Sequence, residues 1–173
     1  SAIVPIPKKG DLAVMGNWRG ISLMPHITKL FNSITAKRLR DGIEGHLGPT
    51  QNGFRPERST TQHIITLMMI EGLADARHWP IHALFVDFQK AFDSLNWEVL
   101  ERILVGWRLP NQLLKAIFSI MRGHTVCVKM GDGTHTDHID VQCGVLQGDT
   151  LAPLLFIIAV DAVLRKIPYD KGI

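Results

Sequence analysis

The sequence predicts an α+β fold, and three observations lead to that prediction. Several segments repeat apolar residues at the helical period of three to four positions. Two regions, one near the start and one in the last third of the chain, have turn residues between short extended runs, which is typical of β-hairpins. The composition, 46% hydrophobic and 20% charged in 173 residues, is that of a globular domain and not of a disordered segment.

The first half of the chain predicts a hairpin followed by two helices. The expected elements are extended runs over 3–6 and 18–23, a helix over 26–44, a loop over 51–58 and a second helix over 59–79. In the first helix, apolar residues at 27, 30, 31, 34 and 39 are expected to face the core. Ser59 and Gln62 have the spacing of a capping box at the start of the second helix, whose Met68 and Met69 are expected in the core.

The second half predicts a buried strand, three helices and another hairpin. The expected elements are a strand over 81–86, helices over 96–107 and 110–122, a hairpin over 126–128 and 139–141, a loop over 144–149 and a final helix. Asp149 or Thr150 is expected to cap that final helix, and Pro153 falls in its first turn, where proline is tolerated. Its apolar run, 151–160, is too short to span a membrane, so we expect a core helix and no membrane partner.

Charge and cysteine content restrict the partners and the compartment. The net charge is +3, but residues 1–60 hold nine Lys and Arg against four Asp and Glu. A basic region beside a carboxylate-bearing one suits a polyanion held over a metal site, although a solvated helix face gives the same counts. Cys127 and Cys143 are too few for a disulfide framework, and they indicate free thiols in a reducing, intracellular compartment, either nucleus or cytoplasm.

The segment 85–94, FVDFQKAFDS, has Asp87 at the end of the predicted buried strand. A carboxylate at that position can bind a divalent cation, because Mg²⁺ prefers carboxylate and backbone oxygens and keeps sites for water and phosphate. Two such ions can stabilise the attacking and the leaving oxygen of phosphoryl transfer. A turn or a helix cap uses the same kind of aspartate, so this segment is informative only together with others.

Two glycine-containing segments complement it. In 144–153, GVLQGDTLAP, Gly148 lets a backbone or a ligand approach closely, and Gln147 offers a donor and an acceptor to a base or sugar. In the first hairpin, Arg19 with Lys8 or Lys9 can bind a triphosphate. The ordinary interpretations are a helix cap with turn glycines and an exposed basic turn.

A further segment, 51–60 (QNGFRPERST), combines an aromatic ring, two guanidinium groups and a helix start. Arg55 and Arg58 in this segment can contact a nucleic-acid backbone or stack on bases. The stretch 135–143 holds possible zinc ligands, but their spacing matches no closed tetrahedral pattern, so we set a zinc site aside.

In this order the four segments resemble the reverse transcriptase domain of non-long-terminal-repeat (LINE-type) retrotransposons. The matching positions run through 3–9, 17–23, 51–60, 87–94 and 147–156, essentially the whole chain. The resemblance implies a right-hand polymerase with fingers over 1–80 and an incomplete, ferredoxin-like palm over 81–173. It also implies a fingers-side insertion near 96–142 and no thumb.

The resemblance implies RNA-directed DNA polymerase activity, a nucleotidyl transfer. The 3′-OH of a DNA primer would attack the α-phosphate of a dNTP opposite an RNA template, and pyrophosphate would leave. The implied roles are Asp87 and the Phe88 carbonyl for Mg²⁺ (or Mn²⁺), Phe92 for excluding a ribose 2′-OH, Gln147 and Gly148 for lining the nucleotide and template, Arg19 with Lys8 or Lys9 for the triphosphate, and Arg55 and Arg58 for the template.

The sequence departs from the family pattern at the second catalytic segment, an aromatic residue, one residue, then two adjacent aspartates. The chain contains no Asp-Asp pair, and Ala152 stands where the family often has serine. Asp161 and Asp170 are poor substitutes, since the first lies inside a predicted helix and the second has no strand pattern around it. One aspartate and a carbonyl cannot hold two Mg²⁺ ions about 4 Å apart.

We therefore expect a fragment that polymerises poorly or not at all by itself, with the rest of the polymerase, a second palm segment and thumb, as its partner. The incomplete palm is also expected to expose apolar surface. Two alternatives stay open. One is a catalytically inactive retroelement remnant that binds RNA through its basic region, and the other is a group II intron maturase, to which 17–22 and 85–94 are less similar.

Overall fold

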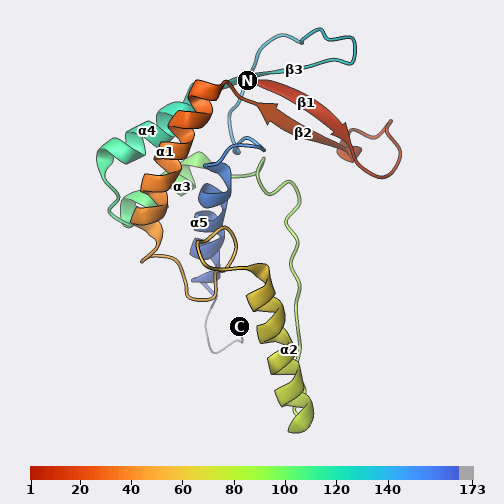
Figure 1. Ribbon diagram of the computed structural model, residues 1–173, viewed down its shortest axis with the longest axis vertical. Coiled ribbons are helices and arrows are strands. Elements are labelled where there is room, and N and C mark those ends of the chain that lie inside the picture. Colours follow the sequence, from red (N-terminus) through yellow and green to blue (C-terminus); the bar gives the residue numbers. More distant parts are fainter. Residues whose placement is uncertain (168–173) are drawn as a thin grey trace.

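The computed structural model describes residues 1–167 as an α+β fold, as predicted. Its strands are β1 (Ala2–Pro7), β2 (Trp18–Leu23), β3 (Thr125–Val128) and β4 (Ile139–Asp140). Its helices are α1 (His26–Ile43), α2 (Thr60–Ala76), α3 (Trp97–Gly106), α4 (Asn111–Arg122) and α5 (Ala152–Leu164), and a 3-10 turn η1 (Met15–Asn17) precedes β2. Figure 1 shows the sheet at one end of a helical body and α2 extending away from it.

The two predicted hairpins form one mixed sheet with the strand order β2-β1-β3-β4. Strands β1 and β2 pair antiparallel from Ala2 opposite Leu23 to Pro7 opposite Trp18, and β3 pairs antiparallel with β4. The two hairpins meet where β1 runs parallel to β3, with Ala2 opposite Cys127. The sheet therefore joins the start of the chain to residues more than a hundred positions later.

The core lies between α1, α3, α4 and α5. Helix α5 lies among these helices and contacts both α1 and α3, and Leu151, Leu155 and Ile158 are almost completely buried (Figure 1). Trp97 and Trp107 pack against this core. In the part of the chain that the structure describes, every helix is too short or too polar to cross a membrane.

Local start signals are confirmed at several helices. The Asn96 side chain accepts a hydrogen bond from the Val99 N–H at 3.0 Å, and Pro153 lies in the first turn of α5. Gln62 accepts a hydrogen bond from the Ser59 N–H at 3.2 Å, one half of the predicted capping box. Helix α2 nevertheless ends at Ala76, three residues before the predicted end.

Helix α1 forms where predicted, but it buries a different face. Of the apolar positions expected inside, Leu39 is buried, whereas Ile27 is 78% exposed and Leu30, Phe31 and Ile34 are also exposed. The buried face carries Asn32, Thr35, Ala36, Leu39 and Ile43. Small residues such as Thr35 and Ala36 let α1 approach the neighbouring helices closely. The spacing of the larger apolar residues therefore predicted the wrong face as the buried one.

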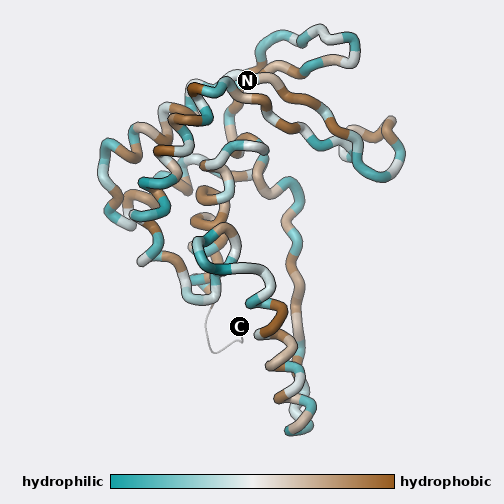
Figure 2. The backbone as a smooth tube through the Cα atoms, in the orientation of Figure 1, coloured by the Kyte–Doolittle hydropathy of each residue, from teal (hydrophilic) through white to brown (hydrophobic). Residues whose placement is uncertain are grey.

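The predicted buried strand over 81–86 is wrong. This segment contains no strand, and Leu84 and Phe85 are 88% and 81% exposed. A buried strand requires neighbours for its backbone N–H and C=O groups, and within residues 1–167 no strand pairs with it. Met68 and Met69, expected in the core, are exposed on α2, in which Ala74 is the buried residue. Figure 2 shows apolar residues along both segments.

We predict that α2 is much less stable to local opening than α5. A 17-residue helix with one buried alanine gains little from packing, and isolated helices of this length are marginal in water. Hydrogen exchange measured on the monomer should give amide exchange in α2 at least about a hundredfold faster than in α5. Equal protection of the two helices would contradict the exposure of α2.

Candidate active site

The loop between β4 and α5 lies against strand β2. The Ser22 N–H donates a hydrogen bond to the Gln147 carbonyl at 2.9 Å. Gly148 has a φ of +109°, and a Cβ there would come within 3.2 Å of the Ser22 carbonyl oxygen. Both the backbone conformation and the close approach favour glycine, which agrees with the contact expected of Gly148.

The same loop contacts the turn over 87–94 at its other end. The Val145 N–H donates to the Phe92 carbonyl at 2.8 Å, and the Trp97 ring N–H donates to the Gly144 carbonyl at 2.7 Å. Gly144 has a φ of +79°, and a Cβ there would lie 2.7 Å from the Asp93 carbonyl oxygen. The loop therefore connects the first hairpin to the turn that follows the 81–86 segment.

These contacts form an open cleft of about 520 Å³ between the first hairpin, the turn and the loop. Five predicted site residues line it: Lys8, Arg19, Phe88, Phe92 and Gln147. Both cations are exposed, and the Lys8 ammonium donates to the Gly16 carbonyl at 3.3 Å. Two cations, two aromatic rings and an amide from three distant segments thus meet in one place.

Three other predicted residues lie beside the cleft without lining it. Lys9 is exposed next to Lys8, and Gly148 follows Gln147 against β2. Asp87 is exposed and precedes Phe88, so it follows an irregular segment instead of ending a strand.

Phe156 on α5 supports both aromatic residues of the turn. Its ring centroid is 6.0 Å from that of Phe88, in an edge-on arrangement, and 5.4 Å from that of Phe92. Such aromatic pairs fix ring positions more firmly than a single contact does. Phe156 was not among the predicted site residues, because nothing in the sequence distinguishes it from the core residues of the same apolar helix.

The described residues do not form a complete metal site. Asp87 and the Phe88 carbonyl supply one carboxylate and one backbone oxygen, and Mg²⁺ takes six oxygen ligands, some of them water. Within residues 1–167 no three His, Cys, Asp or Glu side chains are grouped closely enough to bind one ion, which includes the histidine-rich stretch 135–143. We therefore derive no reaction step through a metal ion.

Asp161 has a structural position. Its side chain is buried in α5, where one oxygen accepts a hydrogen bond from the Gly48 N–H at 2.7 Å and the other pairs with Arg165 at 2.6 Å. This agrees with the expectation that it does not replace a catalytic aspartate. Asp170 lies outside the described residues.

Arg55 and Arg58 are both engaged in the loop between α1 and α2. The Arg55 side chain is 5% exposed and donates to the Glu44 carboxylate and to the carbonyls of Gly48 and Gln51. The Arg55 hydrogen bond holds the pKa of the Glu44 carboxyl below its usual value. Arg58 donates to the Pro49 carbonyl and to the Asn52 side chain. Arg55 therefore has little capacity left to contact a template.

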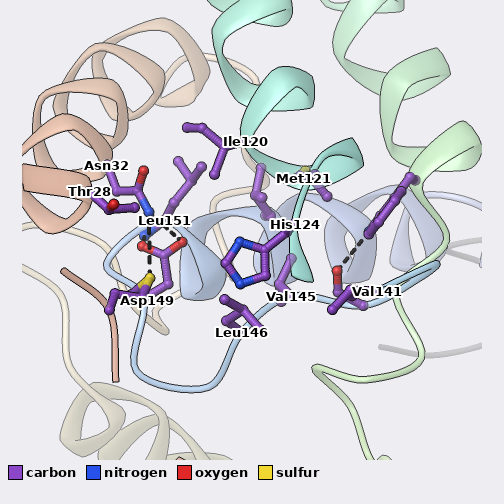
Figure 3. A pocket seen from close by; sticks show the side chains of 14 residues that line it. Thr28, Asn32, Ile120, Met121, His124, Val141, Val145, Leu146, Asp149 and Leu151 are labelled. Carbon is purple, nitrogen blue, oxygen red and sulfur yellow. Dashed lines mark hydrogen bonds between the residues drawn. The ribbon is translucent and has the colours of Figure 1, made fainter. Parts of the chain in front are cut away.

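A small cavity of about 30 Å³ lies behind the loop, between α1, α4 and α5 (Figure 3). Asn32, His124 and Asp149 line it together with apolar side chains. Burial lowers the pKa of His124, and the nearby Asp149 carboxylate acts in the opposite direction. The lowered pKa favours the neutral form of the imidazole.

We predict that Arg55→Ala lowers the free energy of unfolding by about 2 kcal/mol. The Gln51 carbonyl loses its donor, the Gly48 carbonyl keeps only the Gln51 N–H, and Glu44 loses its ion pair. Chemical denaturation measures the change. The control is Lys37→Ala, which removes a cation from the exposed face of α1 and should stay within about 0.5 kcal/mol of the wild type. A loss no larger than that of the control would contradict a structural role for Arg55.

Comparison with known proteins agrees with this geometry. The chain is 29% identical over 168 residues to the Retrovirus-related Pol polyprotein from type-1 retrotransposable element R2 of Popillia japonica, a match that covers 97% of this chain and 23% of that protein. It is 26% identical to the corresponding R2DM polyprotein of Drosophila melanogaster, over 96% of this chain and 16% of that protein. The chain thus spans less than a quarter of the length of these relatives.

A third relative is the probable RNA-directed DNA polymerase from transposon X-element of Drosophila melanogaster, 29% identical over 81% of this chain and 15% of that protein. These relatives favour the retrotransposon interpretation over the maturase alternative. The family model for "Reverse transcriptase (RNA-dependent DNA polymerase)" matches residues 6–171. The chain therefore belongs to the reverse transcriptase (RNA-dependent DNA polymerase) family.

Proposed function

We propose that this chain is the part of a retrotransposon RNA-directed DNA polymerase that receives the incoming deoxynucleoside triphosphate. The observation that carries the proposal is the cleft in which Lys8, Arg19, Phe92 and Gln147 meet. A nucleotide presents a polyanion, a sugar and a base, and the cleft offers a different kind of group to each of them.

The triphosphate would lie against the first hairpin. Arg19 on β2 and Lys8 at the end of β1 are exposed and line the same cleft. A guanidinium gives two parallel donors to a phosphate, and an ammonium adds a point charge. Lys9 is one residue away and adds to the positive potential that attracts a polyanion.

The sugar and base would lie between Phe92 and Gln147. Phe156 packs against the Phe92 ring, so that ring has little freedom to move aside for a ribose 2′-OH. The Gln147 side chain can donate and accept hydrogen bonds, and the backbone around it is bonded to β2 at 2.9 Å. Gly148 would let the template strand approach the same loop.

Catalysis would require more oxygen ligands than the described residues supply. In our proposal Asp87 and the Phe88 carbonyl contribute to binding Mg²⁺ (or Mn²⁺), and carboxylates elsewhere in the polymerase complete the site. The reaction would join the primer O3′ to the α-phosphorus of the dNTP and release pyrophosphate. The RNA template, the DNA primer and the remainder of the polymerase are thus proposed partners.

The proposal keeps fingers over 1–80 and palm over 81–173, with an insertion near 96–142. Residues from both sides of position 80 share one sheet and one core, so this division concerns function more than separate folding. A location in the nucleus or cytoplasm is also proposed, and it is supported by the two cysteines, which are free within the described residues.

The second candidate function is a retroelement remnant that binds RNA without catalysis. The incomplete carboxylate set around Asp87 favours it. It differs from the first candidate in the ligand of the cleft, because it requires the basic hairpin to bind RNA and requires nothing of Phe92 or Asp87. Nucleotide binding therefore distinguishes the two.

We predict that Arg19→Ala lowers the affinity of the 173-residue chain for a dNTP in Mg²⁺ about tenfold, as expected for the loss of a charge-assisted hydrogen bond. Phe92→Ala should reduce the preference for a dNTP over the matching NTP. Calorimetric titration measures both. Lys115→Ala, which removes an exposed cation on α4 outside the cleft, is the matched control and should bind like the wild type.

Equal affinities in Arg19→Ala and wild type would contradict a triphosphate site in the cleft. A salt-titrated RNA-binding assay then tests the second candidate. RNA binding that survives Asp87→Ala but falls in Arg19→Ala and Lys9→Ala, without measurable dNTP binding, would support the non-catalytic remnant.

Primer extension on an RNA template should be weak or absent with this chain alone, because the described residues do not hold two metal ions. The measurement is incorporation of labelled dNTP in Mg²⁺. Robust incorporation that is lost in Asp87→Ala would show that the carboxylate set is sufficient, contrary to our expectation.

A further inference from the structure

A partly buried amide–carboxylate pair connects α1 to the loop that carries Gln147 (Figure 3). The Asn32 side-chain amide donates a hydrogen bond to an Asp149 carboxylate oxygen at 2.9 Å. We propose that Asn32 and Asp149 are positioning residues that fix the Gln147–Gly148 backbone in the cleft. The consequence for nucleotide binding rests on the proposed function, whereas the anchoring of the loop does not.

The burial of Asn32 is costly, which indicates a purpose other than packing. Asn32 is 0% exposed and lies on the core face of α1, beside Thr35 and Ala36. Its side-chain oxygen has no hydrogen-bond partner among the described residues. A buried amide that leaves one oxygen unpaired contributes less to stability than an apolar side chain of the same size. The gain is therefore the hydrogen bond to Asp149.

Asp149 makes two further hydrogen bonds, one to the residue before α5 and one within the loop. Its other carboxylate oxygen accepts a hydrogen bond from the Leu151 N–H at 3.1 Å, just before α5 begins, and Leu151 is buried. Its own N–H donates to the Leu146 carbonyl at 3.2 Å, which closes a turn around Gln147 and Gly148. One carboxylate thus connects α1, the start of α5 and the turn that carries Gln147.

The space behind the loop makes this anchor necessary. The cavity of about 30 Å³ is lined by Asn32, Asp149, His124 and Leu146, and the His124 Nε2 atom is buried without a partner among the described residues. Close packing would hold the loop by shape alone, but a cavity leaves room for Leu146 and Asp149 to shift inward. A directional hydrogen bond can set the position that packing leaves open.

The position of the loop can be measured at Ser22. The N–H of this buried residue donates to the Gln147 carbonyl at 2.9 Å, so its exchange with solvent reports how firmly the loop is held on β2. In Asn32→Leu and in Asp149→Ala we expect Ser22 amide exchange at least about tenfold faster, with exchange in the β1–β2 ladder unchanged. Asp149 is partly exposed, so its variant tests the inference even if Asn32→Leu folds poorly.

A double variant and a conservative variant distinguish a positioning role from a general loss of stability. The double variant of Asn32→Leu with Asp149→Ala should exchange no faster than Asp149→Ala alone, because Asp149→Ala already removes the hydrogen bond to Asn32 together with the one from the Leu151 N–H. Asp149→Asn keeps one acceptor oxygen, for the Asn32 amide or for the Leu151 N–H but not for both, so its exchange should lie between that of the wild type and that of Asp149→Ala. Thr28→Val alters another residue of the same cavity on α1 and should leave Ser22 unaffected.

The dNTP affinity of the same variants tests the functional consequence. We expect about a tenfold loss in Asn32→Leu and Asp149→Ala, and a smaller loss in Asp149→Asn. Unchanged Ser22 exchange, or additive effects in the double variant, would overturn the positioning role whatever the nucleotide results. If Arg19→Ala impairs dNTP binding while Asn32→Leu does not, the proposed function stands and this inference fails. If no variant affects dNTP binding but Ser22 exchange follows our expectation, the proposed function fails and the anchor stands.

Discussion

The close approach of three backbone segments around the 144–149 loop is the constraint on which the site depends. Gly148 lies against β2 and Gly144 against the turn over 87–94, each at a positive φ. A Cβ at Gly144 would collide with the Asp93 carbonyl oxygen, and one at Gly148 would make a tight contact with the Ser22 carbonyl oxygen. The hairpin, the turn and the loop are far apart in the sequence, so no local interaction brings them together. If either contact were lost, the loop would move and Lys8, Arg19 and Phe92 would no longer line the same cleft as Gln147.

Local signals in the sequence predicted much of this arrangement. Turn residues predicted both hairpins, Asn96 predicted the start of α3, and Pro153 predicted the first turn of α5, because each acts within a few residues of itself. The cleft residues were predicted from the order of four motifs. The residues that support them were not: Asn32 looks like an ordinary polar residue of α1, since its partner Asp149 lies 117 positions away.

The wrong predictions share one physical cause. Apolar periodicity gives the spacing of residues that can be buried, but not the surface that buries them. Helix α1 has two such faces and packs through the one with small residues, and the apolar segment 81–86 has no strand beside it within residues 1–167. The sequence therefore indicated correctly that these residues are apolar and incorrectly that they are inside.

The basic residues likewise differ in whether they are free to bind a ligand, which the sequence does not report. Residues 1–60 carry an excess of basic groups, but Arg55 donates from all three guanidinium nitrogens to Glu44 and two carbonyls, whereas Arg19 is exposed on β2 and lines the cleft. A guanidinium whose donors are already paired gains little from a phosphate, since it would have to exchange one set of hydrogen bonds for another. The count of basic residues therefore overstates the charge available to a polyanion in the cleft, to which the first hairpin contributes Lys8 and Arg19.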